Sequence, residues 1–121
     1  IRVHRWQLVA GSGGDGTYRG GRGQLKEYEI LDDVVGTVSY SHRGERHFIA
    51  ADGFAGGKPG ALARSWITRA DGTEDAIPSK IVTRLAPGDR VVISTAGGGG
   101  FGPPAARATD AVARDRADGK V

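Results

Sequence analysis

Residues 95–104 read Thr95-Ala96-Gly97-Gly98-Gly99-Gly100-Phe101-Gly102-Pro103-Pro104. Four consecutive glycines give a backbone without Cβ atoms, and such a backbone is costly to order. An ordered run of this kind is therefore expected to let another strand, another subunit or a ligand approach the backbone closely. Two further glycine clusters, at 11–23 and 53–60, predict loops of the same kind between the other strands.

Short strand patterns separated by turn signals make up most of the remaining chain. Alternating apolar and β-branched residues predict strands over 2–10, 24–31, 34–41, 63–69, 75–78, 81–85 and 90–95. Pro103-Pro104, followed by alanines and arginines, predicts one helix over 105–116. We therefore expect an all-β or mostly β fold: a compact β-sandwich or barrel-like domain with glycine-rich loops and one C-terminal helix, forming a single domain over residues 1–121.

Composition narrows the class of protein. Hydrophobic residues make up 38% of the 121 residues, and the 21 glycines contribute no side chain, so we expect a partner to cover part of the surface. The absence of cysteine excludes disulfides and thiolate metal sites, and it suggests a cytoplasmic location. No apolar run approaches the roughly 18 residues of a membrane span. The net charge of +3 is spread along the chain, which favours a solvated surface with ion pairs over nucleic-acid binding.

Three glycine motifs resemble binding motifs but lack the required context. Gly11, Gly13 and Gly16 match G-x-G-x-x-G, yet helix-breaking glycines follow where a dinucleotide site needs a helix. Gly56-Gly57-Lys58 lacks both the first glycine and the hydroxyl residue of a P-loop. The RGG-like segment 18–23 is a single copy between strands, so a structured loop is the better interpretation.

Catalytic and metal-binding constellations are not evident. The histidines His4, His42 and His47 have no spacing typical of a zinc site, so we expect no metal. No serine has an identifiable base, and no pair of carboxylates stands out. We therefore expect no catalytic residue in this chain.

The glycine clusters nevertheless share one explanation. Five segments follow the order of motifs in the hydantoinase B/5-oxoprolinase family: 12–23 (S-G-G-x-G-x-Y-R-G-G-x-G), 46–60 (R-H…G…G-G-K-P-G), 71–80 (D-G-T…P-S-K), 87–89 (P-G-D) and 97–102 (G-G-G-G-F-G). The chain thus resembles the C-terminal part of a hydantoinase B-type polypeptide. It departs from the usual family pattern at Ala50-Ala51-Asp52 and at Pro103.

This resemblance implies a role in ATP-dependent chemistry on cyclic amides or ketones. It implies hydantoinase A-like and hydantoinase B-like partner subunits, with ATP and Mg or Mn in the parent complex and no cofactor bound by this chain. We expect a small accessory subunit, not catalytic alone, of a carboxylase or hydrolase of the acetophenone carboxylase or hydantoinase type. Candidate substrate or interface residues are Arg19, Arg46, His47, Lys58, Gly97, Gly98, Gly99 and Gly100.

Three alternatives stay open at this point. The candidate arginines could tie loops together or pair with acids of a neighbour, because a guanidinium suits carboxylates as well as phosphates. The chain could instead be a stand-alone RNA- or anion-binding β domain that uses Arg19 and Arg22. It could also be a fragment of one long hydantoinase B-type chain.

Overall fold

The computed structural model describes residues 1–121 and shows a mostly β chain. Its strands are β1 (Arg2–Leu8), β2 (Gln24–Glu29), β3 (Val38–Arg43), β4 (Arg64–Thr68), β5 (Glu74–Ala76), β6 (Lys80–Leu85) and β7 (Arg90–Ser94). A 3-10 turn, η1 (Pro104–Ala106), and one helix, α1 (Thr109–Ala117), follow. The expected mostly β fold with one C-terminal helix is confirmed, although the sheets do not close into a barrel. No helix has the length and apolar character needed to cross a membrane.

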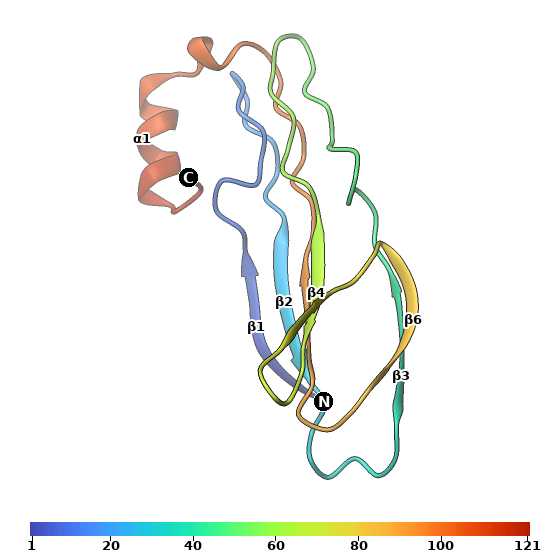
Figure 1. Cartoon of the computed structure of the whole chain (residues 1–121). Coiled ribbons are helices and arrows are strands. Elements are labelled where there is room, and N and C mark those ends of the chain that lie inside the picture. Colours follow the sequence, from blue (N-terminus) through green and yellow to red (C-terminus); the bar gives the residue numbers. More distant parts are fainter.

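Strand β7 is the centre of a five-stranded antiparallel sheet with the order β1-β2-β7-β4-β5 (Figure 1). Strands β3 and β6 pair separately as a two-stranded antiparallel sheet. Successive side chains of a strand point to opposite faces of its sheet. Val91 and Val92 of β7 are each only 2% exposed, so both faces of the sheet are covered at its centre.

The hydrophobic core lies between the two sheets. Its buried members are Ile30, Ile67, Ile77, Leu85 and Val91. The two-stranded sheet also contributes partly buried apolar side chains from β3 and β6. The second sheet therefore acts as a lid over β7 and β4, where Val91 and Ile67 lie.

Two elements begin more than two residues away from their predicted starts. The strand expected from residue 34 begins at Val38, because the turn at 32–33 is followed by a bend at Gly36, where φ is 92°. Val34 still packs against the core, which explains its strand-like pattern. The helix expected over 105–116 is divided into η1 and α1, because Arg107 has an extended backbone with ψ 129°.

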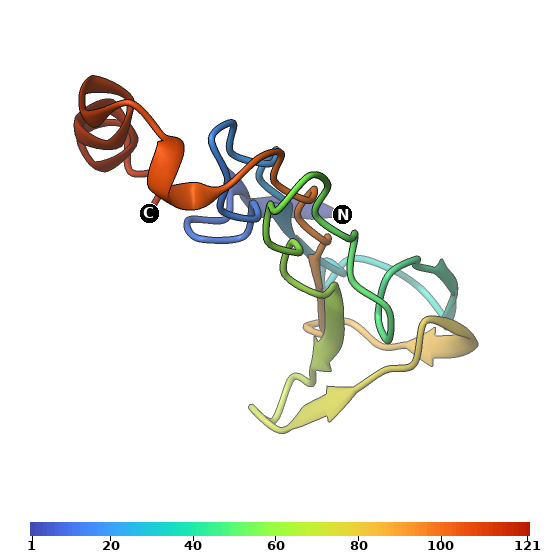
Figure 2. The ribbon, with the colours of Figure 1, turned by 90° about the horizontal axis from the view of Figure 1, so that it is seen from above.

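The glycine-rich segments continue the strands beyond the sheet and gather at one end of the molecule (Figures 1 and 2). We call residues 12–23, 50–61 and 97–102 the glycine bundle. Segment 12–23 connects β1 to β2, segment 50–61 precedes β4, and segment 97–102 follows β7. The central strand of the sheet thus supplies the central segment of the bundle, and α1 lies beside it (Figure 2).

Candidate functional site

The run Gly97–Gly100 is hydrogen-bonded to neighbouring segments inside the glycine bundle. The Gly97 and Gly100 amides donate to the carbonyls of Ala61 and Lys58 at 3.1 and 2.9 Å. The Gly98 amide donates to the Gly21 carbonyl at 2.9 Å. Three of the four amides of the run are therefore occupied and are not free to bind a phosphate.

The hydrogen bonds of the central segment recur every third residue. Gly97 and Gly100 face one neighbouring segment, whereas Gly98 and Phe101 both donate to segment 18–21 on another side. Three residues per turn is the period of the polyproline II helix, which has no internal hydrogen bonds and can bond outward in several directions. The bundle is thus a set of extended threefold chains and not a β-sheet.

Close backbone approach explains why glycine is required at the centre of the bundle. A Cβ atom at Gly97 would overlap the carbonyl of Ser12, and one at Gly99 would overlap the carbonyl of Asp52. By contrast, a Cβ at Gly98 would come no nearer than 3.3 Å to a neighbouring atom. The glycine run was expected to admit another strand, another subunit or a ligand, and in this structure the close contacts come from other loop segments of the same chain.

Arg19, a predicted site residue, connects the glycine bundle to helix α1. Its Nε donates to the Asp115 carboxylate at 3.0 Å, and its NH1 group lies 2.6 Å from the carboxylate of Asp15. Asp115 also accepts hydrogen bonds from Arg107 at 2.9 and 3.0 Å. Hydrogen bonds from Arg107, opposed by burial and assisted by Arg19, lower the pKa of Asp115. Arg19 therefore ties the fold together through its acidic partners.

The alternative of an RNA- or anion-binding loop finds no free arginine pair in this region. The Arg22 guanidinium donates to the Gly119 carbonyl at 3.0 Å, and Arg19 is held by the two carboxylates described above. Lys58 is exposed and forms no ion pair, while its backbone carbonyl accepts from the Gly100 amide. One free lysine is a weak basis for nucleic-acid binding.

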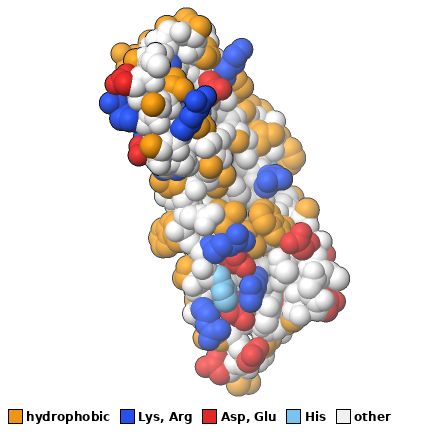
Figure 3. Space-filling model, turned by 90° about the vertical axis from the view of Figure 1, so that its left-hand side faces the viewer, with side chains coloured by type: hydrophobic (Ala, Val, Ile, Leu, Met, Phe, Trp, Pro, Cys, Tyr) orange, Lys and Arg blue, Asp and Glu red, His pale blue; other side chains and the backbone are white.

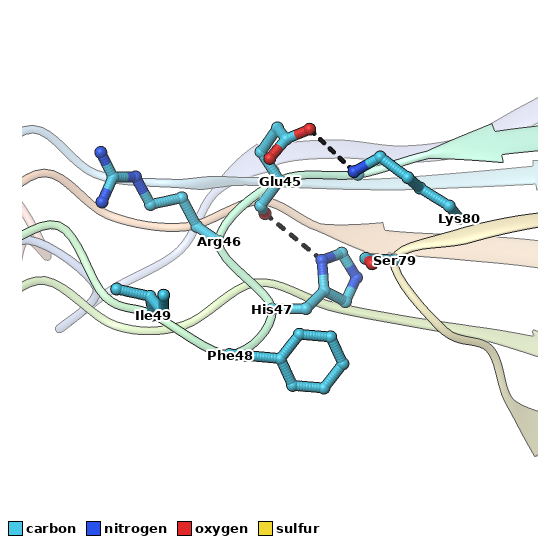
Figure 4. Close-up of a pocket in the computed structure, with 8 residues that line it drawn as sticks. Glu45, Arg46, His47, Phe48, Ile49, Ser79 and Lys80 are labelled. Atoms are coloured by element: carbon cyan, nitrogen blue, oxygen red, sulfur yellow. Dashed lines mark hydrogen bonds and ion pairs between the residues drawn. The ribbon is translucent and has the colours of Figure 1, made fainter.

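Arg46 and His47 lie in a loop after β3 that borders a cavity of about 480 Å³ (Figure 4). Arg46 adopts a left-handed backbone with φ 62°, and its carbonyl accepts from the Ala63 amide at 2.9 Å. Its guanidinium points away from His47 and donates to the Ala50 carbonyl at 3.0 Å (Figure 4). The loop is closed on its other side by the ion pair between Glu45 and Lys80, at 3.0 Å.

His47 forms a hydrogen-bonded pair with Ser65, a residue that the sequence pattern did not single out. The Glu45 carbonyl can only accept, so His47 Nδ1 donates to it at 3.3 Å. In the neutral ring, Nε2 then accepts from the Ser65 hydroxyl at 3.3 Å. Ser65 is buried, and no carboxylate orients the imidazole, so the pair lacks the arrangement of a hydrolytic serine site.

His42 lies beside this pair in the interior. Its Nδ1 is 3.0 Å from the Tyr40 hydroxyl, and its ring packs edge-on against His47 with centroids 5.7 Å apart. Its buried Nε2 has no hydrogen-bond partner, and Gly44 packs directly against the two rings. Burial, reinforced by His47, lowers the pKa of His42, while burial raises the pKa of Tyr40. The third histidine, His4, lies elsewhere, paired with Glu29 at 2.5 Å.

The sequence analysis listed the candidate site residues as one set, but the structure places them in separate parts of the molecule. Arg46 and His47 share one cavity, and Lys58 joins the glycine run through its backbone. Arg19 belongs to a separate cluster with Asp115. No cluster of three or more acidic, histidine or cysteine side chains is positioned to bind a metal ion. The histidine pair, with Ser65 and Tyr40, could not be found from sequence spacing, because Ser65 is brought in by a different strand.

Comparison with known proteins identifies a family and several relatives that are similar to this chain. The family described as hydantoinase B/oxoprolinase matches residues 1–104. The beta subunit of the caprolactamase of Pseudomonas jessenii is 34% identical over 125 residues, which cover 100% of this chain and 21% of the relative. The 5-oxoprolinase of Saccharomyces cerevisiae is 34% identical over 103 residues, which cover 84% of this chain and 8% of that protein.

Solved structures agree with this result. The crystal structure of the ATP-dependent caprolactamase from Pseudomonas jessenii has a TM-score of 0.77 at 29% identity, over 98% of this chain and 21% of that one. A nucleotide-free acetone carboxylase has a TM-score of 0.70 at 25% identity, over 97% of this chain and 19% of that one. The chain spans about a fifth of the length of the caprolactamase beta subunit. It belongs to the hydantoinase B/oxoprolinase family.

Proposed function

We propose that this chain is an accessory part of a multi-subunit ATP-dependent carboxylase or hydrolase, in which it completes the hydantoinase B-like component. The observation that carries the proposal is that the glycine run is occupied by contacts within its own bundle. Gly97, Gly98 and Gly100 all donate to carbonyls of the same chain. The bundle therefore serves as a rigid support and offers no backbone cradle for a nucleotide.

The side chains around the bundle fit an interface better than an active site. Tyr18, Phe54 and Phe101 form an exposed row of aromatic rings, with centroids 6.2 Å and 5.9 Å apart along the row. Exposed apolar patches of this kind mark surfaces that other proteins cover. Two relatives, from a caprolactamase and from a D-/L-hydantoinase, are themselves named as subunits, which supports a multi-subunit assembly.

The proposed reaction activates a carbonyl group with ATP. Relatives include a caprolactamase, a 5-oxoprolinase and an acetone carboxylase, which act on cyclic amides or on a ketone. A hydantoinase A-like subunit would bind ATP with Mg or Mn, and the hydantoinase B-like component would hold the substrate. An acetophenone carboxylase-type or hydantoinase-type assembly is our specific proposal.

Reconstitution tests this function. The chain is co-expressed with the hydantoinase A-like and B-like subunits of its source. ATP hydrolysis is then measured with caprolactam, 5-oxoproline, hydantoin, acetone and acetophenone as substrates. Bicarbonate is added to the assays with the two ketones, acetone and acetophenone. Substrate-dependent ATP hydrolysis should require all the subunits. Turnover of ATP by the isolated chain, or full activity of the other subunits without it, would contradict the proposal.

A further inference from the structure

The two edges of the five-stranded sheet are protected differently. Strand β5 has three residues, two of them acidic, and short charged strands are a common protection against edge-to-edge pairing. Strand β1 at the other edge has seven residues, no proline and an apolar residue at every second position from Trp6 onward. One register shift lies between Val3 and Arg5, which leaves Arg5–Leu8 as a regular, open edge.

One face of β1 is apolar and uncovered. Val3, Trp6 and Leu8 are 50%, 65% and 49% exposed. By strand register they lie opposite Tyr28, Lys26 and Gln24 of β2, on the same face of the sheet as the core. The second sheet covers this face over β7 and β4 but leaves it open over β1. The core face is therefore incomplete at this edge.

The basic side chains on the opposite face of β1 are already paired with carboxylates of β2. Arg5 donates to Glu27 at 2.5 Å, and Arg90 donates to the same carboxylate at 3.3 Å. Arg2 and His4 both contact Glu29. Basic and acidic side chains are accordingly interspersed on the side of the molecule shown in Figure 3. The unsatisfied parts of β1 are its apolar face and its outer backbone edge.

Two side-chain contacts orient Trp6. Its indole Nε1 donates to Gln24 Oε1 at 3.2 Å, and Lys26 Nζ lies 4.7 Å from the ring centroid. A large side chain ordered in advance loses little conformational entropy when a partner covers it, which is a property of interface hot spots. The backbone edge of β1 is also available for pairing. The Val9 amide donates to the Gly23 carbonyl at 2.8 Å, on the side of β2. Because successive amides alternate between the two edges of a strand, the amides of Trp6 and Leu8 point away from β2.

We propose that the hydantoinase B-like polypeptide adds a β-strand to the free edge at Arg5–Leu8 and covers Val3, Trp6 and Leu8 with apolar side chains. The identity of this partner rests on the function proposed above. The whole of this chain matches only 21% of the caprolactamase beta subunit. About four fifths of a hydantoinase B-like component of that length therefore lies outside this chain. Strand addition suits this edge because backbone hydrogen bonds provide affinity and alternate side-chain pockets provide specificity.

Hydrogen–deuterium exchange on the chain alone and in the reconstituted assembly tests the strand pairing. Peptides covering 2–9 should exchange at least about tenfold more slowly in the assembly, while peptides covering β5 should not change. An assembly that forms with β1 still exchanging freely would overturn this inference and leave the proposed function standing. Failure of any assembly to form would instead overturn the proposed function, and with it the proposed occupant.

Substitutions test the apolar face. Trp6→Glu should reduce recovery of the hydantoinase B-like subunit with the tagged chain by about tenfold or more. Val82→Glu is the matched control, since Val82 is a 70% exposed strand residue of the other sheet, and it should have no effect. Circular dichroism should show unchanged folding in both variants, because both side chains are exposed. Equal recovery with the two variants, or concentration-dependent dimers of the isolated chain that protect β1, would overturn the proposal, the latter by making a second copy the occupant.

Discussion

Arg19 Nε donates to Asp115 at 3.0 Å and so joins two residues that are 96 positions apart. The same carboxylate accepts two bonds from Arg107, which also donates to the Thr17 carbonyl at 2.9 Å. Helix α1 has little apolar surface, and Asp115 is its buried residue. Its attachment to the glycine bundle is therefore mainly polar.

Replacing Asp115 by Asn should release α1 from the bundle. The substitution keeps the shape of the side chain but removes the charge that strengthens its bonds with Arg19 and Arg107. Trypsin should then cleave after Arg114 about tenfold faster or more. Asp110→Asn is the control, because its pair with Arg114 at 3.0 Å is exposed on both sides and contributes little. Equal cleavage rates in the two variants would show that other contacts hold the helix.

The same carboxylate predicts a loss of stability in acid. The pKa of Asp115 is lowered in the folded chain, whereas an unfolded aspartate titrates near about 3.9. Below that value the unfolded chain binds more protons than the folded chain, so stability is complete above it and falls as pH decreases towards the folded pKa. Thermal midpoints between pH 6 and 2.5 should fall more steeply for the wild type than for Asp115→Asn. Parallel curves would contradict this assignment.

Alanine substitutions should distinguish the crowded glycines from the open ones. Gly99→Ala would force a methyl group into the Asp52 carbonyl, and we expect it to lower the free energy of unfolding by about 3 kcal/mol or more. Gly21→Ala meets no atom within 4 Å and should stay within about 0.5 kcal/mol of the wild type. Urea denaturation measures both values. A small effect at Gly99 would mean that the bundle is not packed as described.

His42 predicts a second pH dependence, at higher pH. Burial and the neighbouring His47 lower its pKa, whereas a histidine in the unfolded chain titrates near about 6.5. The unfolded chain therefore binds the extra proton first, and the free energy of unfolding should decrease as pH falls below about 6.5. Urea denaturation between pH 7.5 and 5 should show this slope, and His42→Gln should flatten it. An unchanged slope in the variant would assign the effect to another group.

The strands were predicted well from the sequence, because the alternation and turn residues that indicate a strand lie close together in the chain. The alternating patterns at 24–31 and 90–95 both lead to strands that the structure contains. The start of β3 was misplaced, because Val34 and Val35 are β-branched but lie between a turn at 32–33 and a bend at Gly36, which has a positive φ. Strand propensity alone does not show that Val34 packs against the core from outside a strand.

The contacts of the candidate site depend on partners that are distant in sequence. The glycine clusters were predicted as loops, and nothing local shows that Gly97 bonds to Ala61 while Gly98 bonds to Gly21. The pairing of His47 with Ser65 likewise crosses from a loop to another strand. Arg19 was a reasonable candidate for an anion, but its acidic partner lies in the terminal helix. Such pairings follow from topology, which a single sequence does not reveal.

The threefold recurrence of hydrogen bonds in the glycine bundle limits how these segments can change in length. Gly97 bonds to the same neighbouring segment as Gly100, and Gly98 bonds to the same segment as Phe101. Inserting or deleting one or two residues would rotate the downstream amides by a third or two thirds of a turn, away from their acceptors. A change of three residues would restore the phase. Length variation in this part of the molecule should therefore be accommodated in triplets.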